Sequence, residues 1–261
     1  MVQTTERAGH AEQLARDVEG EYDAVFVLGG DGTVMEVLRA LQGTAMPLGI
    51  IPGGTGNLVA RALGIPMGAG SAVRALVWGA TAAIDLGMLP GGRVFAFAAG
   101  IGVDAAMIER TSGAAKRRFG VLAYVLTAAR AALALDSFAL RATVDGVEHR
   151  FQATSAMVVN FGTVLGGILR LGPGIRENDG MLDLCVFSPA STRDALRVGW
   201  RLLRQDFGTD PAMHYLRGRT LLLDTEVPRA SQADGDLLPA GPLHVTVTPL
   251  AARLLVPSAR R

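Results

Sequence analysis

A glycine-rich segment with one aspartate is the part of this sequence most suited to binding a phosphate. Residues 29–33 read GGDGT; they follow an apolar run at residues 25–28 and precede a helix-compatible stretch that ends at Leu41. Where a strand meets a helix, glycines let backbone N–H groups approach a ligand, and the helix N-terminus adds the positive end of its dipole. The carboxylate of Asp31 would repel phosphate, which predicts either a divalent cation beside it or a role in shaping the turn.

A second glycine-rich turn strengthens this interpretation. Residues 52–57 read PGGTGN; they follow the apolar run 47–51 and open another predicted helix. Two strand–turn–helix units within about 35 residues are typical of a βαβ arrangement with a parallel sheet. Ligands of such sheets bind in the crevice at the carboxyl ends of the strands, so both turns are expected to face one site.

Asp-Gly pairs recur in the second half of the chain, at Asp145, Asp179 and Asp234. Asp-Gly is a common turn pair, so each is first of all a turn signal, and residues 144–147 predict a hairpin. Asp179 follows a glycine-rich loop, whereas Asp234 lies between two predicted strands.

Apolar periodicity divides the chain into an α/β half, residues 1–85, and a β-rich half, residues 86–250. The first half has predicted helices at 6–19, 33–41, 58–63 and 71–78, and strands at 23–28 and 47–51. The strand at 23–28 lacks alternation, which predicts burial on both faces. The second half has predicted strands at 93–98, 137–144, 148–160, 181–187, 220–225 and 243–248, and helices at 120–135 and 192–203. Sequential strands with turn signals predict an antiparallel sheet or sandwich, and a return of residues 251–261 to the first half is one option.

Composition excludes several classes of protein. The 261 residues are 49% hydrophobic and carry a net charge of +1, which fits a globular chain and gives no support to bulk nucleic-acid binding. A single cysteine, Cys185, excludes an internal disulfide, and the absence of Gly-Lys-Ser/Thr excludes a P-loop. The N-terminus carries no signal-peptide core, and the apolar stretch 121–135 is too short to span a bilayer. We therefore expect a cytoplasmic protein without a transmembrane segment, with a peripheral position at a membrane as a further option.

Five motifs, in order along nearly the whole chain, resemble those of the diacylglycerol kinase catalytic domain, as found in bacterial lipid kinases related to the sphingosine kinases. They are residues 29–33 (GGDGT), 52–57 (PGGTGN), 100–105 (GIGVDA), 177–183 (ENDGMLD) and 233–236 (ADGD). The first motif alone is shared with NAD kinases and phosphofructokinase-like folds, whereas the ordered set is specific. The resemblance implies an α/β nucleotide-binding domain with a parallel sheet, similar to that of NAD kinases and diacylglycerol kinases, at residues 1–85. It also implies a lipid-binding domain with an antiparallel β-sandwich at residues 86–250.

The resemblance implies roles for individual residues. ATP contacts are expected from Thr5, Gly29, Gly30, Asp31, Gly32, Thr33, Gly54, Thr55 and Asn57. Asp234 matches the proton acceptor for the lipid hydroxyl. Asp236 stands where the family usually has glutamate, with a part in holding Mg2+ or the base, and Asp31 is grouped with these two as catalytic.

A second metal site is implied away from the nucleotide. The resemblance places a structural Mg2+ at the Asp179 side chain and the backbone carbonyls of Arg176 and Met181. The family usually has a further strand before the position of Thr5, so we expect either a displaced start or a shortened form.

Together these implications describe an ATP- and Mg2+-dependent lipid kinase that transfers the γ-phosphoryl group to a hydroxyl of diacylglycerol or a related lipid at a membrane surface. A monomer and a homodimer are both open. Two alternatives are an NAD kinase-like enzyme with a soluble substrate and a catalytically silent binder of lipid or nucleotide. Solvated faces are expected for Arg197 and Arg201 of the predicted helix 192–203 and for Arg204 directly after it. Trp200 among these arginines suggests a contact with a membrane surface.

Overall fold

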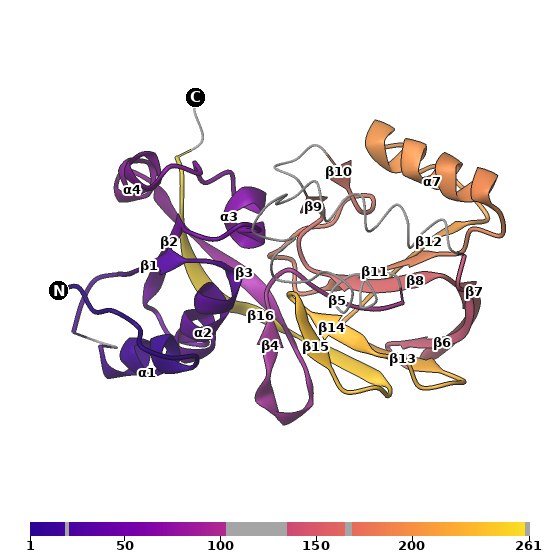
Figure 1. The fold of residues 1–261 in the computed structure, drawn as a ribbon, viewed down its shortest axis with the longest axis horizontal. Coiled ribbons are helices and arrows are strands. Elements are labelled where there is room, and N and C mark those ends of the chain that lie inside the picture. The colour runs from indigo at the N-terminus through magenta and orange to yellow at the C-terminus, as the bar shows by residue number, and fades with distance from the viewer. Residues whose placement is uncertain (19–20, 103–134, 165–168, 259–261) are drawn as a thin grey trace.

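The chain forms an α/β region and a β-sandwich region that lie side by side (Figure 1). The computed structural model describes residues 1–18, 21–102, 135–164 and 169–258. The helix expected at 120–135 therefore lies outside the described residues, apart from its last position. No helix in the described part of the chain is long and apolar enough to cross a membrane.

The α/β region is built from two successive strand–turn–helix units. Its elements are α1 (His10–Asp17), β1 (Val25–Gly29), α2 (Asp31–Leu41), β2 (Pro47–Pro52), α3 (Leu58–Ala62) and α4 (Ala69–Val77). β1 and β2 pair in parallel, from Val25 opposite Leu48 to Gly29 opposite Pro52. In Figure 1, α1 and α2 lie on one side of these strands and α3 and α4 on the other. The predicted βαβ arrangement is confirmed, and α2 begins at Asp31, two residues before the expected start.

β1 corrects one expectation, because it is not buried on both faces. It stands at the edge of its sheet, and the side chains of Phe26 and Leu28 are 40% and 66% exposed, whereas Val27 is buried against the helices. An apolar run without alternation is typical of a strand between two covered faces. The run alone does not reveal that, among the described strands, β1 has a neighbour on one side only.

The β-sandwich region consists of mostly antiparallel strands. Its first elements are β3 (Ala80–Met88), η1 (Pro90–Gly92), β4 (Val94–Phe95), β5 (Ala98–Gly102), β6 (Phe138–Val144), β7 (Val147–Ala153), β8 (Ser155–Val159), β9 (Thr163–Val164) and β10 (Leu169–Arg170). They are followed by β11 (Leu182–Phe187), α7 (Thr192–Arg204), β12 (Met213–Gly218), β13 (Thr220–Thr225), β14 (Ser231–Ala233), β15 (Asp236–Leu238) and β16 (Leu243–Val256). One sheet has the order β12-β11-β8-β5-β14-β15, and the other runs β1-β2-β16-β13-β6-β7 with β3 and β4 branching from β16. The expected fold class, a parallel α/β domain with an antiparallel β-sandwich, is confirmed.

The sequence predicted the position of the β6–β7 hairpin correctly, but it did not predict all strand lengths. β6 and β7 are joined by Asp145 and Gly146, with φ of 48° and 86°, which is the expected Asp-Gly hairpin. The single strand expected at 148–160 is divided into β7 and β8 at Thr154. Cys185 is buried on β11, as expected of an inert thiol.

Two strands run through both regions. β16 pairs with β13 through residues 243–246 and, after a bulge between Thr248 and Ala252, pairs in parallel with β2 at Arg253 and Leu254. β3, which the sequence analysis missed, lies antiparallel to β16 along most of its length. The α/β and β-sandwich regions therefore share one continuous sheet.

A buried aspartate fixes the junction of the two regions. Asp85, on β3, is fully buried. Its Oδ2 accepts the N–H of Gly180 at 2.7 Å and its Oδ1 accepts the N–H of Leu250 at 2.7 Å. Its own N–H donates to the carbonyl of Glu177 at 2.6 Å. Segments about 95 and 165 residues further along the chain are thereby fastened to β3.

Replacing Asp85 tests this fastening. Asp85→Ala leaves two N–H donors without an acceptor, and we expect a loss of about 2–4 kcal/mol in the free energy of unfolding. Asp85→Asn keeps one acceptor oxygen and is expected to lose less. Urea unfolding followed by circular dichroism measures both, and an alanine variant as stable as the parent would contradict the assignment.

Candidate active site

The two glycine-rich turns touch one another through their backbones. β1 ends at Gly29 and β2 at Pro52, and the N–H of Gly53 donates to the carbonyl of Gly29 at 2.8 Å. A Cβ placed on Gly54 would lie 2.6 Å from the Cα of Gly30. Only glycine allows this approach, so Gly30 and Gly54 have a packing reason in addition to any contact with a ligand.

The Asp31 carboxylate binds the second turn. Its Oδ2 accepts the N–H of Asn57 at 2.8 Å and its Oδ1 accepts the N–H of Leu58 at 2.6 Å. Burial raises the pKa of Asp31, and these two hydrogen bonds oppose the rise. Of the two roles that the sequence left open, shaping the turns is the one that these contacts describe. The catalytic and nucleotide-binding roles of Asp31 stay predictions.

Asn57 holds the second turn in its unusual backbone conformation. Its φ is 49°, its Oδ1 accepts the N–H of Gly54 at 2.9 Å, and its Nδ2 donates to the carbonyl of Gly54 at 2.7 Å. Both ends of the amide are therefore used inside the turn. The nucleotide contact expected of Asn57 stays a prediction.

Arg61 is a cation beside these turns that the sequence analysis did not single out. It lies on α3, one helical turn after Asn57, and its Nε donates to the carbonyl of Gly56 at 2.8 Å. Burial raises the pKa of Asp31, and the charge of Arg61 is among the smaller effects that oppose the rise. An arginine four residues after the helix-opening Asn57 was the available signal.

The remaining predicted nucleotide contacts surround the turns or precede them. Thr55 and Gly32 are exposed at the two turns. The side chain of Thr33 packs against Gly29, so that a Cβ built on Gly29 would lie 2.8 Å from the Cβ of Thr33. Thr5 lies in the exposed segment before α1. That segment is attached to α2 at Gly9, whose N–H donates to Oε1 of Glu36 at 2.8 Å.

Asp234 is both a turn residue and a candidate base. It forms, with Gly235, the two-residue turn between β14 and β15, and its φ is 48°. Its carboxylate accepts three backbone N–H groups, from Ala96 at 2.6 Å and from Phe97 and Ala98 at 2.9 Å. A carboxylate has about four acceptor positions, so one position on Oδ2 is left for a further donor.

The surroundings of Asp234 raise its pKa to about 6. Burial is the main cause, the three N–H groups oppose it, and the negative charge of Asp31 adds to the rise. Asp31, about 200 residues earlier in the sequence, therefore contributes to the electrostatic surroundings of Asp234. A carboxylate with this pKa is ionised at neutral pH and accepts a proton more readily than an ordinary aspartate.

A fully buried asparagine supports the backbone that holds Asp234. The Nδ2 of Asn160 donates to the carbonyls of Ala96 and Asp85, both at 2.8 Å. Asn160 thus links the β4–β5 connection, which supplies the donors to Asp234, to the junction at Asp85. The sequence signal was a polar residue at the end of the apolar run 156–159.

The other predicted acidic residues form ion pairs. Asp236 is exposed, and its Oδ2 accepts from Nη2 of Arg93 at 2.9 Å. Asp179 is paired with Arg217, and its Oδ1 accepts the N–H of Met181 at 3.2 Å. Asp183, beside Arg217, keeps a buried Oδ2 without a partner, and burial raises its pKa to about 6.

In the described part of the chain, each of the two expected Mg2+ sites has only one carboxylate side chain to offer, Asp236 at the expected nucleotide site and Asp179 at residues 176–181. Among the residues that the structure describes, no group of three or more His, Cys, Asp or Glu side chains is placed to hold a metal. Mg2+ is usually held by one or two carboxylates together with substrate phosphates, so one free carboxylate oxygen suffices at a nucleotide. At residues 176–181 the donors are hard oxygens that suit Mg2+, but the Asp179 carboxylate is already paired with Arg217.

Comparisons with known proteins cover both regions. Residues 1–89 match the diacylglycerol kinase catalytic domain and residues 98–256 match the YegS C-terminal NAD kinase beta sandwich-like domain. A diacylglycerol kinase of Mycobacterium tuberculosis is 30% identical over 94% of this chain and 80% of its own length. An uncharacterized protein of Synechocystis is 27% identical, and the chain spans 60% of that relative's length. The crystal structure of a diacylglycerol kinase from Bacillus anthracis superposes with a TM-score of 0.74 at 22% identity, covering 97% of this chain and 83% of the other, which shows a common fold.

The contact between the turns is testable at Asp31. In Asp31→Asn one carboxylate oxygen becomes an NH2 group, so one of the two backbone donors loses its acceptor. We expect the amide hydrogens of Asn57 and Leu58 to exchange about 10-fold faster or more, which corresponds to the loss of one charge-assisted hydrogen bond. Hydrogen exchange measured by mass spectrometry checks this, with β11 as the internal reference, and unchanged protection at residues 57–58 would contradict it.

Proposed function

The chain belongs to the diacylglycerol kinase family, and we propose that it transfers the γ-phosphoryl group of ATP to a hydroxyl of diacylglycerol or a related lipid. The observation that carries this proposal is the Asp234 carboxylate, which three backbone N–H groups hold in place with one acceptor position free. The proposed nucleotide region is residues 1–85 and the proposed lipid region is residues 86–250. The substrate would place the protein peripherally at the cytoplasmic face of a membrane, where ATP is available.

In the proposed reaction, Asp234 takes the proton of the lipid hydroxyl. The hydroxyl oxygen forms a bond to the γ-phosphorus as the bond from that phosphorus to the β–γ bridging oxygen breaks, and ADP leaves. The proton stays on the Asp234 carboxylate until solvent removes it. Phosphoryl transfer depends mainly on positioning and charge neutralisation, so the base contributes by orienting the hydroxyl as well as by accepting its proton.

The glycine-rich turns are proposed to bind the phosphates of ATP. Thr5, Thr33, Thr55, Asn57 and the backbone amides of Gly29, Gly30 and Gly32 are the proposed contacts. Gly54 is proposed to allow close approach of the backbone, because its own N–H is donated to Oδ1 of Asn57. Asp31 positions the second turn through its hydrogen bonds to the N–H groups of Asn57 and Leu58, and Asn57 holds Gly54 within that turn. In the absence of a P-loop lysine, Arg61 is the side chain proposed to add positive charge at this place.

Mg2+ bound with ATP would supply neutralisation of the negative charge that develops on the phosphates. Asp236 is the proposed ligand, because its Oδ1 lies outside the ion pair with Arg93. The loop of Arg176, Asp179 and Met181 is proposed as a separate structural site, in which a bound ion would compete with Arg217 for the Asp179 carboxylate.

Turnover by an Asp234 variant tests the assignment. We expect Asp234→Asn to lower kcat by about 10²–10⁴-fold, because the amide accepts no proton. Asp145→Asn is a matched control, since Asp145 occupies the same position of an Asp-Gly hairpin and also accepts backbone N–H groups, from Arg219 and Thr220. The assay uses ATP with a panel of diacylglycerol, other lipids and NAD.

Each result of that panel has a distinct meaning. Equal turnover by Asp234→Asn and the parent would refute the base assignment. Phosphorylation of NAD and of no lipid would establish the soluble-substrate alternative, and ATP binding without any turnover would establish the silent binder.

The pH dependence of kcat is expected to follow Asp234. Because its folded pKa is raised to about 6, the base is ionised above that pH and protonated below it. We therefore expect kcat to be level above pH 7 and to fall about 10-fold per pH unit below pH 6. An acid limb near pH 4, the range of an ordinary aspartate, would show that Asp234 is not the base.

A further inference from the structure

Helix α7 presents an apolar stripe to solvent. Leu196, Trp200 and Leu203 follow one another at spacings of four and three residues, and they are 63%, 60% and 55% exposed. The opposite side of the helix is packed, with Val198 buried in a small cluster that includes Ala212 and Met213. A stripe of three large apolar side chains on a surface helix is a feature of interaction sites.

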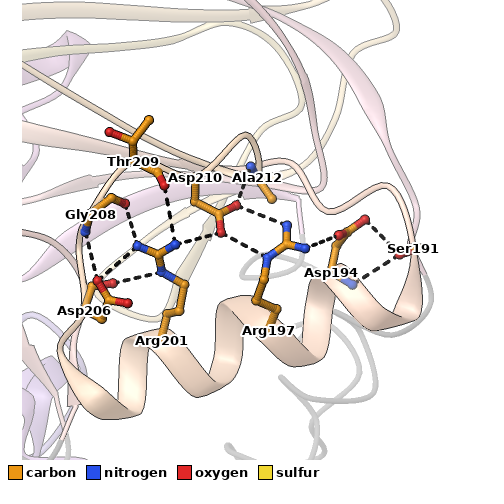
Figure 2. Close-up of polar contacts among 9 residues, drawn as sticks. All are labelled: Ser191, Asp194, Arg197, Arg201, Asp206, Gly208, Thr209, Asp210 and Ala212. Carbon is orange, nitrogen blue, oxygen red and sulfur yellow. Dashed lines mark hydrogen bonds and ion pairs between the residues drawn. The ribbon is translucent and has the colours of Figure 1, made fainter.

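The polar contacts of α7 hold the helix in the orientation that keeps this stripe facing solvent. Figure 2 shows Arg197 and Arg201 converging on Asp210, whose side chain is only 3% exposed. The Nε of Arg197 and the Nη1 of Arg201 donate to Oδ2 of Asp210, both at 3.0 Å, and Arg201 also donates to the carbonyl of Gly208 at 2.7 Å. Arg197 is exposed, as the sequence suggested, whereas the side chain of Arg201 is only 17% exposed and corrects that expectation. The contacts of both arginines prevent the helix from turning its apolar stripe inward.

Two arginine side chains beside the stripe are exposed and able to bind an anionic partner. Arg193 and Arg204 are exposed, and neither forms an ion pair with a carboxylate of the described residues. The guanidinium of Arg204 lies 5.4 Å from the centre of the Trp200 ring. The acidic side chain of this helix, Asp194, is occupied by Ser191 and Arg197.

We propose that α7 docks onto the surface of an anionic lipid bilayer, with Leu196, Trp200 and Leu203 in the interface and Arg193 and Arg204 on lipid phosphates. Helices with aromatic and leucine side chains on one face and arginines beside them lie in the plane of such interfaces. A second copy of this chain fits less well, because two such faces would bring four unpaired arginines together. The purpose of this docking rests on the proposed lipid substrate, whereas the binding itself needs no turnover.

The two tryptophans of the chain allow a direct test. Trp78→Phe leaves Trp200 as the only reporter, and Trp200→Phe leaves Trp78, which is 80% exposed next to α4. With vesicles of phosphatidylcholine and phosphatidylglycerol, without ATP or diacylglycerol, we expect a blue shift and protection from acrylamide for Trp200 but not for Trp78. Vesicles of phosphatidylcholine alone are expected to give neither change.

Charge reversal provides the second measurement. We expect the double variant Arg193→Glu, Arg204→Glu to sediment with anionic vesicles at least 10-fold less than the parent. The control, Arg16→Glu with Arg74→Glu, changes the net charge equally at exposed positions outside α7 and is expected to bind like the parent. Circular dichroism and the Tm of each variant verify folding.

The outcomes separate this proposal from the proposed function. No vesicle binding, equal signals from both tryptophans, or equal loss in the control variant would overturn the docking of α7. Dimerisation in sedimentation velocity that the Arg193→Glu, Arg204→Glu variant strengthens, without vesicle binding, would assign the face to a second copy and would also overturn it. Turnover of a short-chain soluble diacylglycerol without vesicles tests the kinase activity independently, so vesicle binding without turnover would overturn the proposed function alone.

Discussion

The fold depends on aspartate carboxylates that accept backbone N–H groups from remote segments of the chain. Asp31 holds the second glycine-rich turn, Asp85 holds residues 180 and 250, and Asp234 holds residues 96–98. Each bond is charge-assisted and removes a buried donor that would otherwise lack a partner. Because the donors are main-chain groups, each carboxylate fixes the path of a loop. The glycines then allow the fixed loops to approach as closely as they do.

Hydrogen bonding of a carboxylate to backbone N–H groups also explains how a turn residue becomes a candidate catalyst. Asp145 and Asp234 occupy equivalent positions in two Asp-Gly hairpins, and both accept backbone N–H groups. They differ in their surroundings, since burial and the charge of Asp31 raise the pKa of Asp234. The turn and the catalytic interpretations of Asp234 are therefore compatible, because the turn supplies the position and the surroundings supply the basicity.

The sequence predicted those features of the fold that depend on residues close together in the chain, such as turns and hairpins. Glycine-rich turns after apolar runs indicated the parallel β1–β2 pair, and Asp-Gly indicated the β6–β7 hairpin. The exposure of Leu28 was missed because it depends on which strand lies alongside β1. β3 was missed because its alanines and glycine carry little strand propensity. The strand expected at 243–248 was too short, whereas the return of residues 251–261 to the first half, one option from the sequence, agrees with the pairing of Arg253 and Leu254 with β2. The Asp31 and Asn160 contacts were also beyond sequence reasoning, since their partners lie on other elements.

The continuous strand β16 has a consequence for how the protein is made. Leu254 is fully buried and pairs with Leu48 of β2, so the α/β region contains a strand that is translated about 200 residues after its neighbour. Domains generally fold as units during synthesis, the N-terminal one first. Here the first region has no complete sheet until β16 leaves the ribosome, and the free edge of β2 is open to wrong pairing in the meantime. The nascent chain therefore depends on late closure, and the two regions mature together.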